Sequence, residues 1–353
     1  MEKKDLRIIF MGTPEFAVES LKRLVEGGYN VVAVVTQPDK PVGRHQDTLQ
    51  PSQVKQYAVE HGLPVLQPVK MKDPEFVEQL RSYQADLQVV VAFRMLPEVV
   101  WAMPKFGTFN VHAALLPQYR GAAPINWAVI NGEKETGVTT FFLDHDIDTG
   151  RIIMQKRFPI PESADVEYVY DGLMHLGADL ALETIDALIA AGGNIESMPQ
   201  EKLIGEGVEL KSAPKIFKET CRIDFHKPAK QVYDFVRGLS PYPGSWTEIK
   251  KKASVVIFED ADGEMPEATA HPAQQKSAAK IQVLKIFKTS LTEFSRGVAP
   301  VGSLRVFEKK LQVACLDQWL NIEELQLSGK KRMDAAAFLN GMKDIAYYEC
   351  QKA

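Results

Sequence analysis

L-R-I-I-F-M-G-T-P (residues 6–14) and Y-N-V-V-A-V-V-T (residues 29–36) are the two segments that predict the architecture of the first half of the chain. Each contains a short, continuously apolar run, and a helical pattern that includes Phe16, Leu21 and Leu24 lies between them. Continuous Val/Ile runs that alternate with helices are typical of parallel strands buried on both faces. The sequence therefore predicts an α/β domain built on a doubly wound, mostly parallel, Rossmann-like sheet. Neither G-x-G-x-x-G nor G-x-x-x-x-G-K-[ST] is present, so dinucleotide binding and P-loop chemistry have no support.

The composition is that of a globular protein with room for two domains: 353 residues, 45% apolar and 25% charged. The charged residues 1–7 lead straight into a strand, and no run of about eighteen apolar residues follows. We therefore expect neither a signal peptide nor membrane association. Cys221, Cys315 and Cys350 are widely spaced and match no metal-ligand pattern, which indicates free thiols in a cytoplasmic protein without a metal.

Charge is divided unevenly along the chain. Residues 1–210 carry 19 Lys+Arg against 29 Asp+Glu, a balance of −10, whereas residues 211–353 carry 23 against 17, a balance of +6. A basic half beside an acidic half suggests that the second half faces a polyanion, although a solvated surface of mixed charge gives the same counts. The pattern becomes irregular after Gly192-Gly193. We expect a first domain over 1–192, a linker over 193–210 and a second domain over 211–353.

The second domain has a different pattern, with several short strands separated by turns. This spacing favours a small β-barrel of the oligonucleotide-binding type, an architecture that also occurs in barrels that bind no nucleic acid. The predicted strands lie at residues 247–249, 255–258, 281–287, 303–307, 311–315 and 319–325.

The candidate functional residues lie in N-V-H-A-A-L-L-P-Q-Y-R-G-A-A-P (residues 110–124). Asn110 and His112 flank one Val at the end of an extended run, so a strand turns both side chains to the same face. The amide can donate to a developing oxyanion, and the imidazole titrates near neutrality. Asp148, in D-H-D-I-D-T-G (residues 144–150), could fix the orientation and charge of the imidazole. The three predict acyl-group chemistry, although an Asn-x-His pair is also a common structural feature.

Two other polar segments invite a binding interpretation. Residues 144–148 begin like a calcium loop, but the acid that should complete it is missing, so we predict no metal site. Residues 37–50 form a loop rich in Pro and Gly on the ligand side of the sheet. Arg44 is the candidate anion contact in this loop, and the alternative is an ordinary solvated arginine.

Five motifs occur in order: F-M-G-T-P, T-Q-P-D-K-P-x-G-R, F-N-V-H-x-x-L-L-P-x-Y-R-G-A-A-P, T-G-V-T and D-T-G. With A-P-K-I-F-K-E-T-C-R-I-D-F (residues 213–225), they make the chain resemble, over essentially its whole length, the methionyl-tRNA formyltransferase family of 10-formyltetrahydrofolate-dependent enzymes. Two stretches differ from the family pattern. The loop after Arg44 lacks the usual lysines, and residues 93–97 (F-R-M-L-P) replace a longer Tyr-Gly segment.

The resemblance implies transfer of a formyl group from 10-formyltetrahydrofolate to the amino group of methionine on initiator tRNA, for translation initiation. Asn110 would donate to the oxyanion, and His112 would stabilise it and take part in proton transfer. Asp148 would relay the proton lost by the amine.

The same resemblance implies the binding residues. Arg44 would contact the acceptor stem of the tRNA, and we expect a monomer. The residues that would line the folate site are Ala114, Leu115, Leu116 and Pro117.

Other functions are consistent with parts of this pattern. They are a formyltransferase for an amino sugar or another small amine, a hydrolase that deformylates the folate, and a folate- or RNA-binding protein without catalysis. The basic second domain favours a nucleic-acid acceptor over a small amine. The complete set of Asn110, His112 and Asp148 favours chemistry over binding alone.

Overall fold

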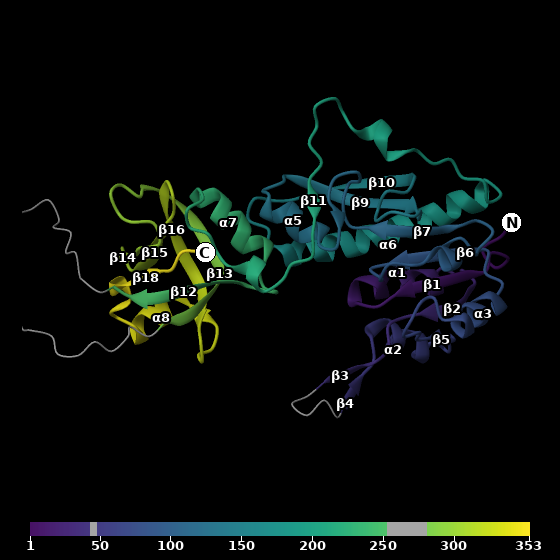
Figure 1. Cartoon of the computed structure of the whole chain (residues 1–353), viewed down its shortest axis with the longest axis horizontal. Coiled ribbons are helices and arrows are strands. Elements are labelled where there is room, and N and C mark those ends of the chain that lie inside the picture. Colours follow the sequence, from purple (N-terminus) through teal and green to yellow (C-terminus); the bar gives the residue numbers. More distant parts are fainter. Residues whose placement is uncertain (43–47, 253–280) are drawn as a thin grey trace, which may run out of the picture. The chain divides into compact units, whose positions relative to one another are not determined.

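The computed structural model describes residues 1–42, 48–252 and 281–353 of the chain (Figure 1). Arg44 and the predicted strand at 255–258 therefore lie outside the described residues. The other candidate site residues all lie within them.

The chain divides into two compact units. The first consists of Met1–Val129 with Glu133–Ile216, and the second of Ile130–Gly132 with Phe217–Ala353. Each unit has a hydrophobic core of its own, as expected of a domain.

A seven-stranded sheet organises the first unit, in the order β10-β9-β7-β6-β1-β2-β5. The run from β5 to β7 is parallel, whereas β9 is antiparallel to both β7 and β10. The predicted mostly parallel, doubly wound sheet is confirmed. Its strands are β1 (Ile8–Gly12), β2 (Val31–Val35), β5 (Val65–Leu66), β6 (Leu87–Val91), β7 (Thr108–His112), β9 (Glu135–Phe142) and β10 (Ile152–Pro159).

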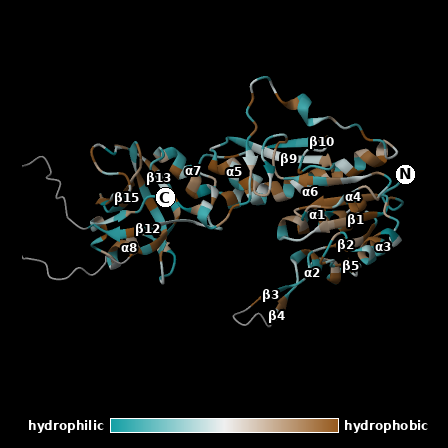
Figure 2. Ribbon diagram, in the orientation of Figure 1, coloured by the Kyte–Doolittle hydropathy of each residue, from teal (hydrophilic) through white to brown (hydrophobic). Residues whose placement is uncertain are grey.

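Helices cover both faces of this sheet, because every central strand is apolar on both sides. Ile8 and Phe10 of β1 belong to a core that includes residues of α1 and α6, whereas Ile9 and Met11 belong to a core with residues of α3 and α4. Figure 2 shows hydrophobic residues concentrated in β1 and the strands beside it. The helices are α1 (Glu15–Glu26), α2 (Gln53–Glu60), α3 (Pro74–Ser82), α4 (Glu98–Trp101), α5 (Pro124–Ile130) and α6 (Val166–Ala190).

The turn after β1 depends on glycine. A Cβ on Gly12 would lie 2.6 Å from the Cβ of Ala17 and 2.9 Å from the carbonyl oxygen of Val91. Only a residue without a side chain lets α1 begin this close to the sheet. At the end of β2, the chain continues into a small hairpin of β3 (Lys40–Val42) and β4 (Thr48–Gln50).

The second unit is a nearly closed antiparallel barrel in the order β14-β15-β16-β13-β12-β18. A bridge between Ser303 and Glu349 joins the two ends of this order. The predicted barrel is confirmed, and β18 is a strand that the sequence pattern did not predict. The elements are α7 (Ala229–Gly238), β12 (Ser245–Lys251), β13 (Gln282–Ser295), β14 (Leu304–Phe307), β15 (Lys310–Ala314), β16 (Gln318–Leu327), β17 (Met333–Asp334), α8 (Ala335–Gly341) and β18 (Tyr348–Cys350).

The three cysteines are free and buried, as predicted for the thiols. Burial raises the pKa of both Cys315 and Cys350 to about 12, so neither carries a reactive thiolate near neutral pH. No helix in the described part of the chain is long and apolar enough to cross a membrane.

Replacement of Leu21 by Ala should destabilise the first unit. Leu21 is completely buried in the core on the α1 side of the sheet. Its truncation removes apolar contacts and leaves a cavity, which should lower the free energy of unfolding by about 2–5 kcal/mol. Denaturant unfolding followed by circular dichroism measures this change. The control is Lys22→Ala, on the next position of the same helix but exposed, which should change stability by less than about 0.5 kcal/mol.

Candidate active site

The site begins at the carboxyl end of β7, between β6 and β9. Phe109 and Val111 point into the core on the α1 side, so the strand alternation turns Asn110 and His112 to the opposite face. Asn110 lies beside Val90 of β6 in the register of the sheet. The predicted common orientation of the amide and the imidazole is therefore present.

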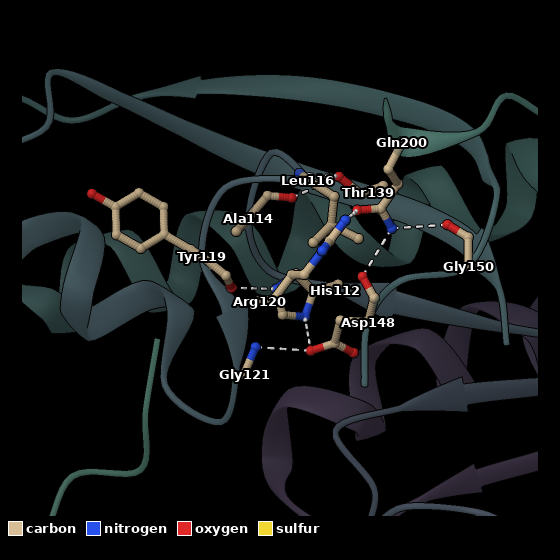
Figure 3. Close-up of polar contacts among 10 residues, drawn as sticks. All are labelled: His112, Ala114, Leu116, Tyr119, Arg120, Gly121, Thr139, Asp148, Gly150 and Gln200. Atoms are coloured by element: carbon tan, nitrogen blue, oxygen red, sulfur yellow. Dashed lines mark hydrogen bonds and ion pairs between the residues drawn. The ribbon is translucent and has the colours of Figure 1, made fainter. Parts of the chain in front are cut away.

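His112 is held by a hydrogen bond that also fixes its tautomer (Figure 3). Its Nε2 lies 2.8 Å from the carbonyl oxygen of Tyr119, and the ring is only 6% exposed. A carbonyl can only accept, so Nε2 carries a proton and donates it in this bond. The other nitrogen, Nδ1, lies 3.7 Å from Oδ2 of Asp148. Nδ1 is therefore the nitrogen that is free to exchange a proton.

A backbone amide of the loop after His112 positions the carboxylate of Asp148. Its Oδ2 accepts a hydrogen bond of 2.9 Å from the amide of Gly121, which belongs to the short strand β8 (Arg120–Gly121). Asp148 adopts the left-handed conformation with φ of 55°, which is costly for a residue with a side chain. The surrounding contacts must hold it there.

Gln200, the first residue of the 3₁₀-helix η1 (Gln200–Leu203), supplies such contacts. Its Nε2 donates to the carbonyl oxygens of Asp148 and Gly150, both at 2.8 Å. Its Oε1 accepts from Nε and Nη2 of Arg120, at 3.0 and 2.6 Å. Gln200 is completely buried. One side-chain amide thus ties the loop that carries Asp148 to the loop after His112.

Position 150, whose carbonyl accepts from Gln200, must be glycine. A Cβ at this position would lie 1.6 Å from the carbonyl oxygen of Phe142, so no other residue fits the D-T-G turn.

The side-chain amide of Asn110 can form further hydrogen bonds. Its Oδ1 is buried and has no hydrogen-bond partner among the residues that the structure describes. A buried polar atom without a partner is costly unless a ligand satisfies it. Because amide oxygen and nitrogen are assigned from their partners, the group as a whole is available to a substrate.

The three residues meet at a cavity of about 560 Å³, the size of a typical small-molecule site. Asn110, His112 and Asp148 all line it. Its apolar wall includes Phe16, Phe93, Met95, Leu96, Trp101, Ile125, Leu143, Ile147 and Val166, and its other polar side chains include Arg94, Asn126, Asp144, His145, Asp146 and Tyr170.

The segment expected to line the folate site, residues 114–117, is held by hydrogen bonds to β9. None of Ala114, Leu115, Leu116 and Pro117 is among the residues that line the cavity. The hydroxyl of Thr139 donates to the carbonyl of Ala114 and accepts from the amide of Leu116, at 2.7 and 3.1 Å, and the Leu116 side chain packs in a small core. This segment is therefore bound to β9, behind the catalytic residues.

Several features of the site had no signal in the sequence. Gln200 follows Asp148 after fifty-two positions and belongs to no motif, and the tautomer set by Tyr119 depends on a backbone atom. His145 is exposed and lies on the cavity wall beside Trp101. Among residues 1–42, 48–252 and 281–353, no group of three or more His, Cys, Asp or Glu side chains is placed to hold a metal ion.

Comparison with known proteins agrees with this architecture. Residues 6–185 match the formyl transferase family, and residues 215–343 match the formyl transferase C-terminal domain. The chain belongs to the formyl transferase family.

Two similar proteins are both named methionyl-tRNA formyltransferase. The methionyl-tRNA formyltransferase of Parabacteroides distasonis is 56% identical over 349 residues, covering 99% of both chains. That of Phocaeicola vulgatus is 59% identical over 344 residues, covering 97% of this chain and 98% of the relative.

Solved structures share the fold at low identity. WlaRD, a sugar 3N-formyl transferase crystallised with dTDP and 5-N-formyl-THF, is 18% identical with a TM-score of 0.59, covering 92% of this chain and 99% of its own. An N-formyltransferase from Helicobacter canadensis, crystallised with folinic acid and dTDP-3-aminofucose, is 20% identical with the same TM-score, covering 90% and 98%.

Gln200→Leu should loosen the Asp148 loop. The variant keeps the side-chain volume but removes both donated hydrogen bonds and leaves Arg120 without its acceptor. Each unsatisfied buried group costs about 1–3 kcal/mol, so amide hydrogen exchange over residues 148–151 should accelerate at least ~10-fold. The control Gln53→Leu changes an exposed glutamine of α2 and should leave this exchange unaltered. Unchanged protection in Gln200→Leu would show that other contacts hold the loop.

Proposed function

We propose that this chain transfers the formyl group of 10-formyltetrahydrofolate to the amino group of methionine on initiator tRNA, the reaction that prepares this tRNA for translation initiation. The observation that carries the proposal is the convergence of Asn110, His112 and Asp148 on one cavity. The near full-length identity to two methionyl-tRNA formyltransferases supports the choice of acceptor.

In the reaction, the neutral amine attacks the formyl carbon. A new C–N bond forms, the bond between the formyl carbon and N10 of the folate breaks, and the proton of the amine is finally delivered to N10. His112 is the group that moves this proton. Since its Nε2 is engaged by Tyr119, Nδ1 accepts and returns the proton in this proposal.

Asn110 stabilises the charge that develops on the formyl oxygen. Its amide lines the cavity, and the buried position of this amide lets a hydrogen bond to the oxyanion act in a region from which water is largely excluded. A donor already fixed on β7 needs no rearrangement during the reaction.

Asp148 stabilises the protonated form of His112. With Oδ2 at 3.7 Å from Nδ1, its carboxylate stabilises the imidazolium that forms when His112 takes a proton. The same carboxylate can relay the proton of the amine to the ring. The amide of Gly121 keeps Oδ2 in place throughout.

The folate occupies the apolar part of the cavity in this proposal. Met95, Leu96, Trp101 and Ile147 offer flat and apolar surface for its ring system. We propose that the segment of Ala114, Leu115, Leu116 and Pro117 contributes to the folate site, held in position by its hydrogen bonds to Thr139.

The tRNA is bound through charge. Residues 211–353, most of which belong to the second unit, carry 23 Lys+Arg against 17 Asp+Glu, and an excess of basic residues is typical of a nucleic-acid partner. Arg44 remains a proposed contact with the acceptor stem.

His112→Ala should lower the rate of formyl transfer by about 10²–10⁴-fold, the range of a lost general acid–base group. Asn110→Ala should lower it by about 10²–10³-fold, as for the loss of one oxyanion donor. The assay is single-turnover formylation of methionyl initiator tRNA, with methionyl elongator tRNA and free methionine as parallel acceptors.

The matched control is His61→Ala, because His61 is an exposed histidine at the end of α2, and this variant should transfer at the wild-type rate. Wild-type rates in His112→Ala would contradict the mechanism. Transfer by the wild-type protein to an amino sugar but to none of the three acceptors would contradict the proposed substrate.

A further inference from the structure

Tyr119, whose carbonyl accepts the hydrogen bond of His112, is bound through three of its own groups. Its carbonyl oxygen lies 2.8 Å from Nε2 of His112, and its amide donates to the carbonyl of Lys211 at 2.6 Å. Its hydroxyl donates to Oε1 of Glu133, also at 2.6 Å. Figure 3 shows the ring of Tyr119 pointing away from His112, while its carbonyl faces the imidazole. The contact with His112 therefore comes from the backbone of a residue whose side chain is bound elsewhere.

The backbone of Tyr119 depends on these contacts, because its φ is 60°. Residues with a Cβ rarely adopt this left-handed conformation, and it persists only where the surroundings hold it. The side chain of Tyr119 is 5% exposed, so it is enclosed as well as hydrogen-bonded. Loosening this side chain would let the backbone return to a negative φ and would turn the carbonyl away from Nε2 of His112.

Glu133 joins the two anchors of Tyr119 to each other. The same oxygen, Oε1, accepts from the hydroxyl of Tyr119 and from Nζ of Lys211, both at 2.6 Å. Lys211 is also the residue whose carbonyl accepts from the amide of Tyr119. The amide of Glu133 donates to the carbonyl of Ala128 in α5 at 3.0 Å, which anchors the backbone that bears the carboxylate. Glu133 is therefore held by a helix and holds Tyr119 in turn.

We propose that Glu133 is a positioning residue for His112 and that it acts through Tyr119. Its carboxylate holds the phenol, the phenol holds the left-handed backbone, and the carbonyl of that backbone holds Nε2 so that Nδ1 faces Asp148. The consequence for the reaction rests on the proposed function, in which His112 moves the proton. The orientation of the ring does not depend on that function and can be measured separately.

The kinetic test compares variants of the cluster in single-turnover and steady-state formylation. Glu133→Ala should lower kcat about 10- to 100-fold, the range for a catalytic group that is slightly displaced. The KM for the folate should not change, because neither Glu133 nor Tyr119 is among the residues that line the cavity. Tyr119→Phe should lower kcat as far as Glu133→Ala does, and the double variant no further, because both remove the same hydrogen bond.

A conservative variant should restore the function. Glu133→Gln keeps an oxygen that can accept from the hydroxyl of Tyr119 and removes only the charge that faces Lys211. The side chain of Lys211 is half exposed, so loss of this ion pair should lower kcat at most about 5-fold.

A spectroscopic measurement distinguishes positioning from a general loss of structure. In protein with isotope-labelled histidine, the Nε2 proton of His112 should exchange slowly with solvent, because it is hydrogen-bonded and buried. Its signal is assigned by its absence in His112→Ala. In Glu133→Ala this proton should exchange at least ~10-fold faster, whereas Glu133→Gln should keep the slow exchange.

The matched control is Glu135→Ala. Glu135 is a half-exposed carboxylate that is ion-paired with Arg157 of β10, and its loss should change neither kcat nor the exchange of the His112 proton. Wild-type exchange in Glu133→Ala would overturn the inference, and so would a wild-type kcat of that variant in an active enzyme. Faster exchange in Glu133→Ala, with no formyl transfer by the wild type to any acceptor, would support the inference and contradict the proposed function.

Discussion

The hydrogen bond between Nε2 of His112 and the carbonyl of Tyr119 determines how the whole site is arranged. It commits one ring nitrogen to the backbone and leaves Nδ1 for Asp148 and the substrate. That choice depends on the loop after β7 folding back so that Tyr119 meets the strand end from which the loop began. Tyr119 takes a positive φ of 60° to do so.

The connection between β9 and β10 carries Asp148 to this ring. Because β9 runs antiparallel to β7, it ends beside Phe109, and the amide of Leu143 donates to the carbonyl of Thr108, at the end of β7 opposite to His112. The connection places Asp148 near the residues that begin at His112, and Gln200 then fastens the two loops to each other. The acid is therefore held near the ring by the amide of Gly121 and by Gln200, and not by strand pairing.

The residue pattern within a single strand or helix was enough to predict those parts of the site whose geometry depends on that element alone. The alternation of a strand was enough to place Asn110 and His112 on one face, and continuous Val/Ile runs were enough to predict the parallel sheet. The contact of Asp148 with His112 was proposed from motif order and chemistry, and the structure brings the two together at 3.7 Å.

The remaining features depend on chain segments that meet only in the folded protein. Gln200 acts on carbonyl groups, which leave no trace in the side-chain pattern. The segment from Ala114 to Pro117 follows the catalytic strand directly, but its hydrogen bonds to Thr139 turn it toward β9 and away from the cavity lining. The sequence pattern does not reveal this direction, because a hydroxyl on another strand, that of Thr139, decides it.

The short pairing of β8 with β11 (Ser212–Ala213) has a consequence for how the chain can vary in length. The amide of Tyr119 donates to the carbonyl of Lys211 at 2.6 Å, and Gly121 fits so closely that a Cβ would lie 2.5 Å from the carbonyl oxygen of Ala213. These residues precede the start of the second unit, where a connecting segment would ordinarily tolerate insertions. One inserted or deleted residue here would shift the register against β8 and displace the carbonyl that orients His112. Insertions and deletions are therefore tolerated before residue 211. The few residues after it cannot change in number, because they help to orient the imidazole of His112.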